Sequence, residues 1–135
     1  MTINHVFIYS TPALMSRMLT FYRTSLKPLG YTEKINAFNG TVVGFGSDFP
    51  YLWLKQVPEG DKPYATHVAI DAPDNAAVDE FHKLAVENGG TDHGAPGNRD
   101  EMSVQPYYAA FALDPQGNNI EAVRLIKKGQ PGSLS

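Results

Sequence analysis

Two histidines and one glutamate fall in predicted strands, and they are the side chains best suited to chemistry. His5 and His67 each lie in an alternating apolar segment, the pattern of a half-buried strand. Glu121 stands between two apolar residues in a third such strand. A carboxylate without partners inside a domain costs several kcal/mol. Glu121 is therefore expected to be paired, hydrogen-bonded or bound to a metal.

Each of these side chains also has a purely structural explanation. The histidines could be satisfied by the backbone or by each other, because neutral histidine is tolerated at partly buried sites. Glu121 could instead be a surface residue or the ion-pair partner of Arg124 or Arg99. The sequence contains no cysteine, so any metal would have to be held by His, Asp or Glu.

The composition is typical of a globular domain. The chain has 135 residues, of which 42% are apolar and 19% charged, enough for one domain with a real core. A formal net charge of -3 provides no basic surface for nucleic acid. No apolar run approaches the roughly 20 residues that span a bilayer, and no secretion signal is recognisable. We expect a cytoplasmic protein that binds neither nucleic acid nor membrane.

The two halves of the chain repeat the same order of elements. Predicted strands cover residues 3–9, 31–37, 41–46, 51–56, 65–71 and both arms of a closing hairpin at 107–123, predicted helices cover 12–26 and 76–86, and 91–99 reads as mostly loop. Asn4-His5-Val6 and Thr66-His67-Val68 correspond at nearly the same offset as Leu29-Gly30 and Gly89-Gly90. We therefore predict an α+β fold of paired βαβββ modules at about 1–57 and 64–126, with a flexible tail at 127–135.

The sequence resembles the vicinal oxygen chelate superfamily, which includes glyoxalase I, extradiol dioxygenases, fosfomycin-resistance proteins and bleomycin-binding proteins. The resemblance covers nearly the whole chain and is carried by Asn4-His5-Val6, Phe21-Tyr22, Leu29-Gly30-Tyr31, Thr66-His67-Val68-Ala69, Gly94-Ala95-Pro96-Gly97 and the run from Asp114 to Val123. It implies a cupped mixed sheet around a metal, with the helices on the outer side. The matching ligand positions are His5, His67 and Glu121.

The resemblance also implies an activity. Two imidazoles and one carboxylate leave open positions on a divalent metal, here Fe, Mn, Ni or Zn. Such a site suits a metal-dependent lyase or dioxygenase that chelates a small oxygenated substrate. Glu121, Arg99 and Tyr107 are the expected catalytic residues, the last two as hydrogen-bond donors from the pocket wall. A homodimer is expected because related short members commonly form one.

The chain departs from glyoxalase I at one ligand position. That enzyme's pattern has a fourth ligand, a carboxylate tied to proton transfer, in the last strand of the first half. No carboxylate stands near Leu54, where it is expected. Extradiol dioxygenases match better in ligand number, although their chains are usually longer. The alternative function is therefore a metal-free small-molecule binding or resistance protein of the bleomycin-binding type, in which Trp53 stacks on a planar ligand.

The remaining aromatic and histidine side chains are less informative. Tyr9, Phe7, Trp53 and Tyr108 line the cavity or belong to the core, and the core is the simpler interpretation. His93 lies in a glycine-rich loop at the expected pocket mouth, and His82 is expected at the solvent edge of a helix.

Overall fold

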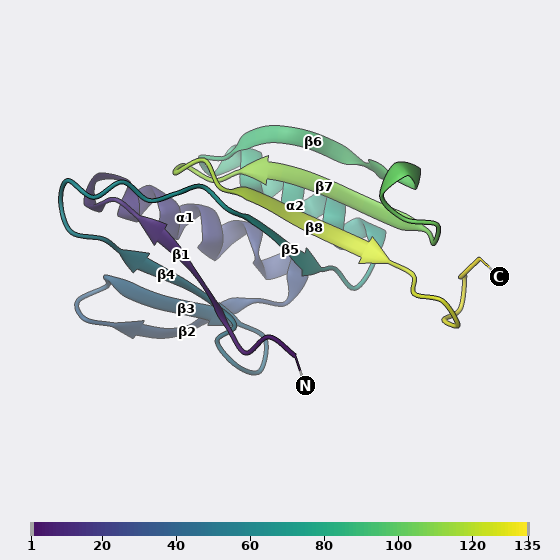
Figure 1. Ribbon diagram of the computed structural model, residues 1–135, viewed down its shortest axis with the longest axis horizontal. Coiled ribbons are helices and arrows are strands. Elements are labelled where there is room, and N and C mark those ends of the chain that lie inside the picture. Colours follow the sequence, from purple (N-terminus) through teal and green to yellow (C-terminus); the bar gives the residue numbers. More distant parts are fainter. Residues whose placement is uncertain (1, 135) are drawn as a thin grey trace.

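The computed structural model describes residues 2–134 and contains two modules of similar layout (Figure 1). The outermost positions of the predicted ranges, Met1 and Ser135, lie outside the described residues. The first module comprises β1 (Val6–Ser10), η1 (Pro12–Leu14), α1 (Met15–Ser25), η2 (Lys27–Leu29), β2 (Thr32–Ala37), β3 (Val42–Gly46) and β4 (Leu52–Gln56). The second comprises β5 (His67–Asp71), α2 (Asn75–Glu87), β6 (Thr91–Asn98), η3 (Asp100–Met102), β7 (Tyr107–Leu113) and β8 (Asn119–Leu125).

Each module forms a sheet of four strands with the same topology. The strand orders are β1-β4-β3-β2 and β5-β8-β7-β6. In both sheets the first strand of the module pairs in parallel with the last, and the other neighbouring strands are antiparallel. The repeated order confirms the predicted α+β architecture of paired βαβββ modules.

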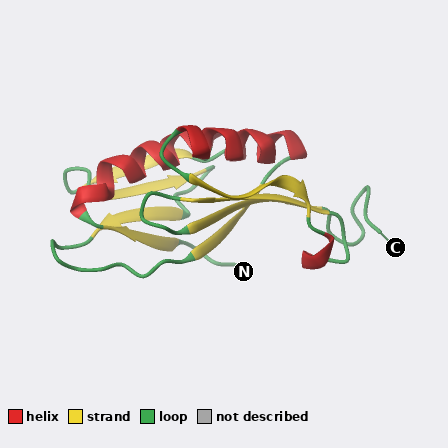
Figure 2. Cartoon of the chain, turned by 90° about the horizontal axis from the view of Figure 1, so that it is seen from above, coloured by secondary structure: helices red, strands yellow, loops and turns green. Residues whose placement is uncertain are grey.

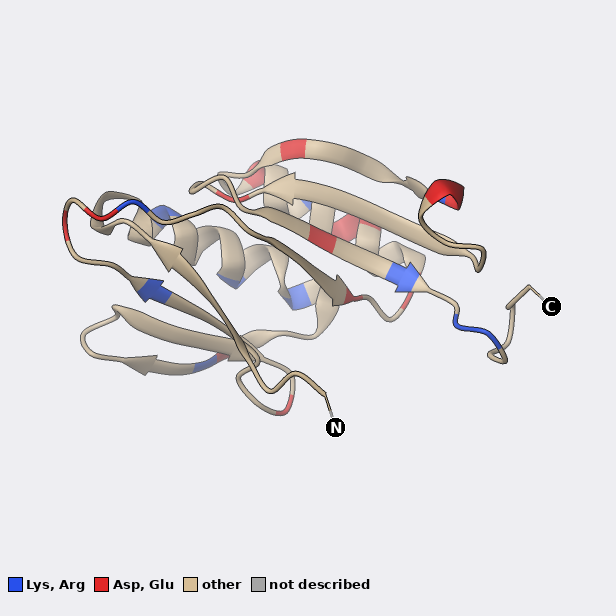
Figure 3. Ribbon diagram, viewed as in Figure 1, with Lys and Arg blue, Asp and Glu red and all other residues tan. Residues whose placement is uncertain are grey.

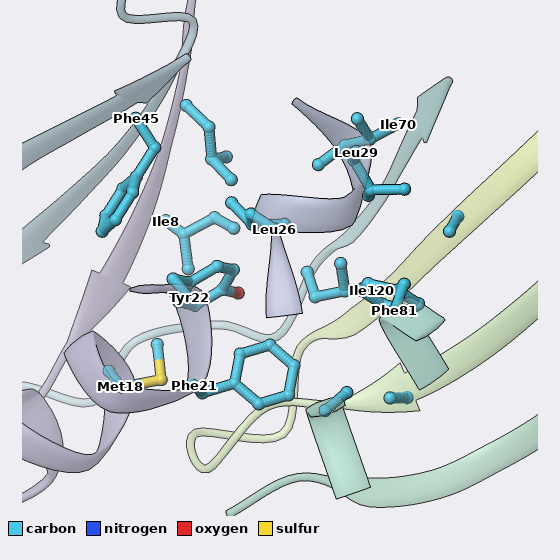
Figure 4. Packing of buried hydrophobic residues seen from close by; sticks show 14 of the residues in the cluster. Ile8, Met18, Phe21, Tyr22, Leu26, Leu29, Phe45, Ile70, Phe81 and Ile120 are labelled. Carbon is cyan, nitrogen blue, oxygen red and sulfur yellow. The ribbon is translucent and has the colours of Figure 1, made fainter. Parts of the chain in front are cut away.

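Both helices lie on the same side of the two sheets (Figure 2). The Asp74 carboxylate caps α2 by accepting a hydrogen bond of 2.8 Å from the N–H of Ala77, the favoured arrangement at a helix start. Phe21 from α1 and Phe81 from α2 are fully buried. Side chains of both modules belong to one hydrophobic core (Figure 4). No helix within the described part of the chain has the length and apolar character to cross a membrane.

Neither α1 nor α2 covers the opposite face of each sheet, which we call its open face (Figure 2). Alternation along β1 buries Ile8 in the core and leaves Phe7 and Tyr9 37% and 44% exposed. The Phe7 ring stacks on Tyr9 at 6.2 Å and on Trp53 at 5.9 Å between centroids. Few residues of either sheet are charged (Figure 3), although the exposed Lys55 pairs with Tyr9 at this face. The open face of the first sheet is therefore an exposed aromatic surface.

The segment 91–99, predicted as mostly loop, instead forms an edge strand. β6 pairs with β7, with register shifts between Asp92 and Gly94 and between Gly94 and Gly97. Pro96 lies in the second of these irregular stretches, which is where a sheet tolerates proline. Because glycine and proline are not typical of strands, the sequence pattern did not predict this one. The strand forms because the backbone groups along the edge of β7 need hydrogen-bond partners.

The turn between β7 and β8 ties the modules together. Its Asp114 carboxylate is 3% exposed and accepts a hydrogen bond of 2.5 Å from the hydroxyl of Tyr22 on α1. It also accepts bonds from the side-chain amide of Asn118 at 2.8 Å and from the N–H groups of Gln116 and Asn118 at 2.9 Å. Burial, and then the Asp114 charge, raise the pKa of Tyr22 well above its usual value. As predicted from the sequence, Gly117 takes the positive φ of this turn, +94°.

Candidate functional site

The second sheet brings His67 and Glu121 together on its open face. β5 and β8 are parallel, and Ala69 pairs with Glu121; alternation therefore places His67, two residues before Ala69, on the same face as Glu121. Their Nε2 and Oε1 atoms lie 3.0 Å apart. Glu121 is 1% exposed, whereas the His67 side chain is 47% exposed. The pair is a buried carboxylate facing an imidazole that solvent can reach.

The other nitrogen of His67 also faces an oxygen atom. Nδ1 lies 3.1 Å from the backbone oxygen of Asn119. A carbonyl oxygen and a carboxylate oxygen both only accept hydrogen bonds, so a neutral ring, which has one N–H, satisfies only one of the two contacts. Its second nitrogen then presents a lone pair to an oxygen, an unfavourable contact unless a second proton or a cation lies between them. A histidine whose outer N–H is held by a backbone carbonyl is also the arrangement typical of metal ligands.

Tyr107 holds the second oxygen of the same carboxylate. Its hydroxyl donates a hydrogen bond to Glu121 Oε2. Burial, followed by the hydrogen bond and the charge of Glu121, raises the pKa of Tyr107 well above its usual value. One Glu121 oxygen is thus engaged by a phenol and the other faces His67, which fixes the orientation of the carboxylate.

We expect Tyr107 to stay protonated through the ordinary tyrosine range. A group whose pKa is raised on folding contributes stability below its unfolded pKa and loses it only as the pH rises through the folded value. Difference absorbance between parent and Tyr107→Phe should therefore contain no phenolate transition near the usual tyrosine pKa of about 10. A transition there would mean that the hydroxyl is free of Glu121.

Phe111 links the remaining candidate, Arg99, to the pair. The Phe111 ring stacks on His67 at 6.1 Å with an interplanar angle of 24°. The guanidinium of Arg99 lies 5.6 Å above the centre of the same ring and donates a hydrogen bond to the backbone oxygen of Ala95. Sequence reasoning missed Phe111, although it shares a strand face with Tyr107 in the alternation of β7 and pairs directly with Glu121.

His5 is not in contact with this group, although it lines the same cavity as His67. It precedes β1 by one residue, whereas the sequence predicted it inside the strand. β1 pairs with β4 only from Leu52 onward, and the Tyr51 N–H donates to the backbone oxygen of Phe45 instead. The His5 Nδ1 atom lies 2.7 Å from the side-chain oxygen of Asn4. Within residues 2–134, no three side chains of His, Asp or Glu gather at metal-binding spacing. The structure brings two of the three predicted ligands together.

The strand register identifies the counterpart of Glu121 in the first module. Phe7 pairs with Trp53 in the first sheet, as Ala69 pairs with Glu121 in the second. Since the duplication aligns Phe7 with Ala69, Trp53 occupies the position of the absent carboxylate. The sequence pattern predicts that position near Leu54, but Leu54 is fully buried in the core. An indole stands where a fourth ligand would be.

Gly44 makes room for that indole. It pairs with Trp53 across β3 and β4, and a Cβ atom at Gly44 would lie 2.9 Å from the Pro50 Cβ and 3.1 Å from the indole. Gly44→Ala should therefore shift the fluorescence of Trp53, the single tryptophan, and lower the unfolding free energy by about 1–3 kcal/mol. Gly97→Ala is the control, because its nearest neighbour is the movable end of Arg99. Equal emission spectra for both variants would contradict the close packing at Gly44.

The other two histidines lie outside the pair. His82 Nε2 is 2.9 Å from the Asp92 carboxylate, linking α2 to β6. That hydrogen bond is the main cause that lowers the pKa of Asp92. His93 is exposed on β6.

No protein-family profile and no curated protein sequence matches this chain, but solved structures do. A glyoxalase/bleomycin resistance protein from Albidiferax ferrireducens is 26% identical, with a TM-score of 0.74 over 90% of this chain and 97% of that one. A glyoxalase/bleomycin resistance protein/dioxygenase family enzyme from Burkholderia phytofirmans is 17% identical, with a TM-score of 0.65 over 93% and 99%. A lactoylglutathione lyase from Agrobacterium tumefaciens is 18% identical, with a TM-score of 0.64 over 91% and 92%. These likenesses confirm the resemblance to the vicinal oxygen chelate superfamily.

Proposed function

We propose that this chain is a metal-dependent enzyme of the glyoxalase or extradiol dioxygenase type, with His67, Glu121 and His5 as ligands of Fe, Mn, Ni or Zn. The observation that carries the proposal is the orientation of His67, whose Nδ1 lies against the Asn119 carbonyl oxygen while Nε2 faces the buried carboxylate. When bound, a divalent metal with three protein ligands supplies Lewis-acid polarisation of two vicinal substrate oxygens.

The neighbouring side chains have distinct roles in this proposal. Tyr107 holds one oxygen of Glu121, and the other oxygen is left for the metal. Stacking on Phe111 fixes the plane of the His67 ring. Arg99, held above Phe111, is placed to donate a hydrogen bond to a substrate oxygen. Because both oxygens of Glu121 are then engaged, the hydroxyl of Tyr107 is the group that can exchange a proton with the bound substrate.

We further propose that the protein is a homodimer and that His5 of a second copy completes the site. The open faces of both sheets lie on the same side of the molecule (Figure 2). Within one chain, the open face of one sheet therefore does not pack against that of the other. In a two-fold dimer, if the first sheet of one copy contacts the second sheet of its partner, symmetry forms the same contact a second time. The exposed stack of Phe7, Tyr9 and Trp53 supplies apolar surface for such a contact.

Mixing two variants tests the shared site. His5→Ala and Glu121→Ala homodimers should each fail to retain metal. If a site takes His5 from one copy and Glu121 from the other, random exchange of subunits restores about one quarter of the sites, because each mixed dimer contains one intact site. The two variants are unfolded and refolded together, and the metal content of the mixture then measures the fraction of restored sites. His93→Ala, which alters an exposed histidine outside the pair, is the control.

Two outcomes would contradict parts of the proposal. Absence of recovery in the mixture, with both parents metal-free and the wild-type chain loaded, would place all three ligands in one chain. Retention of metal by either homodimeric variant would remove that residue from the ligand set. A single-chain mass by light scattering would refute the dimer.

One observation favours the metal-free alternative, a binding or resistance protein. The Trp53 indole and the Phe7 ring stack at an interplanar angle of 27°, a flat aromatic surface on which a planar ligand can stack. In that case, planar aromatic ligands should quench Trp53 fluorescence equally in the chelator-treated parent and in His67→Ala. Quenching only in the metal-loaded parent would support the enzyme instead.

A further inference from the structure

We infer that the cavity beside His67 selects a substrate that carries a positive charge on an apolar or aromatic body, remote from its chelating oxygens. The cavity has a volume of about 730 Å³, and both His5 and His67 line it. No lysine or arginine is among the described residues of its lining. The inference rests on the proposed function in one respect, namely that the ligand of this cavity is the substrate.

The cavity offers an apolar floor and an aromatic wall. Leu29, Leu52 and Ile70 line it and are each at most 7% exposed. Tyr31 and Tyr51 also line it, with ring centres 6.1 Å apart. An alkyl or aryl body loses unfavourable contact with water in such a space, and tyrosine faces attract organic cations.

Carboxylates act on this wall from two sides. Asp71, at the end of β5, lines the cavity. Asp48 accepts a hydrogen bond of 2.8 Å from the Tyr51 hydroxyl. Burial raises the pKa of Tyr31, and the charges of Asp71 and Asp48 raise it further. Asp71 and Asp48 therefore place negative charge at this wall.

The basic groups near these two carboxylates lie outside the lining of the cavity. Lys34 acts on Asp48 from outside the cavity lining. Arg124 and Lys127 lie with Asp71 around a separate, smaller hollow of about 240 Å³. An anionic ligand in the larger cavity would lose hydration without gaining a cationic partner. An ammonium group would instead gain attraction to the Asp71 carboxylate and to the faces of the tyrosine rings.

Three phenyl probes of matched shape test the charge preference without any metal. Phenethylamine, phenethyl alcohol and hydrocinnamate are titrated calorimetrically into chelator-treated protein. Phenethylamine should bind about tenfold more tightly than hydrocinnamate, with the alcohol between them. Asp71→Asn should remove most of that preference. Asp61→Asn, an equal charge change on an exposed loop residue, should leave it intact.

Equal or tighter binding of hydrocinnamate, or binding of none of the probes, would overturn the inference. The inference also fails if Asp71→Asn changes the preference no more than Asp61→Asn does. Repeating the titration with dopamine and hydrocaffeate, which add vicinal hydroxyls, separates this result from the proposed function. Failure of metal to tighten dopamine binding, with the amine preference intact, would refute the metal site and leave the cation site standing.

Discussion

Asp114→Ala is expected to lower the free energy of unfolding by about 3–5 kcal/mol, because it removes a buried charge from its partners. The carboxylate accepts hydrogen bonds from one buried hydroxyl, one buried side-chain amide and two backbone N–H groups. Without it, Tyr22 and Asn118, both at most 1% exposed, lose acceptors that water cannot replace. Denaturant unfolding, followed through Trp53 fluorescence and circular dichroism, measures the loss.

Asp48→Ala is the matched control. Asp48 also accepts a hydrogen bond from a tyrosine, at 2.8 Å, but it is exposed. A surface substitution of this kind changes stability by no more than about 0.5 kcal/mol. If Asp114→Ala cost as little as Asp48→Ala, the closing turn would not be a connection between the modules.

Glu121→Gln is expected to weaken metal binding by at least about 100-fold, while the protein stays folded. The amide replaces every contact of the carboxylate, because its oxygen can accept from Tyr107 and its NH2 group can donate to His67 Nε2. Removing the negative charge takes away one ligand and leaves no buried polar atom unpaired. Calorimetric titration with Mn²⁺ and Zn²⁺, beside a thermal melt, separates affinity from stability.

The same variant distinguishes a metal site from a structural ion pair. If His67 and Glu121 exist as an imidazolium–carboxylate pair, Glu121→Gln removes the attraction and the melting temperature falls. If the pair is a metal site, the metal-free protein melts at an equal or higher temperature after the substitution. Glu121→Ala, which leaves Tyr107 and His67 without their acceptor, should be less stable in either case.

Local sequence patterns were sufficient to predict those site residues whose positions follow from strand alternation and from the duplication. His67 and Glu121 fall on one strand face in each of two predicted strands, and the parallel pairing of β5 and β8 brings them to 3.0 Å. Tyr107 shares its strand face with Phe111 for the same reason. The turn residues Pro115 and Gly117 specify the closing hairpin through their backbone preferences.

The features that sequence reasoning missed depend on distant contacts. Trp53 rather than Leu54 is the counterpart of Glu121 because of the register of β1 against β4, which no local pattern encodes. Tyr22 reaches Asp114 across 92 positions. The position of His5 relative to the pair depends on how modules pack, and strand periodicity carries no information about that. The sequence of the irregular strand β6 shows neither the apolar alternation of a regular strand nor a recognisable turn motif, so it was not predicted as a strand.

The most direct test of the central claim is the metal content of the untagged protein by plasma mass spectrometry, beside the double variant His5→Ala, His67→Ala. The proposal predicts near-stoichiometric divalent metal in the parent and its loss from a folded double variant. A parent that retains no metal after incubation with Fe, Mn, Ni and Zn in turn would contradict it, and the chain would then be a small-molecule binder.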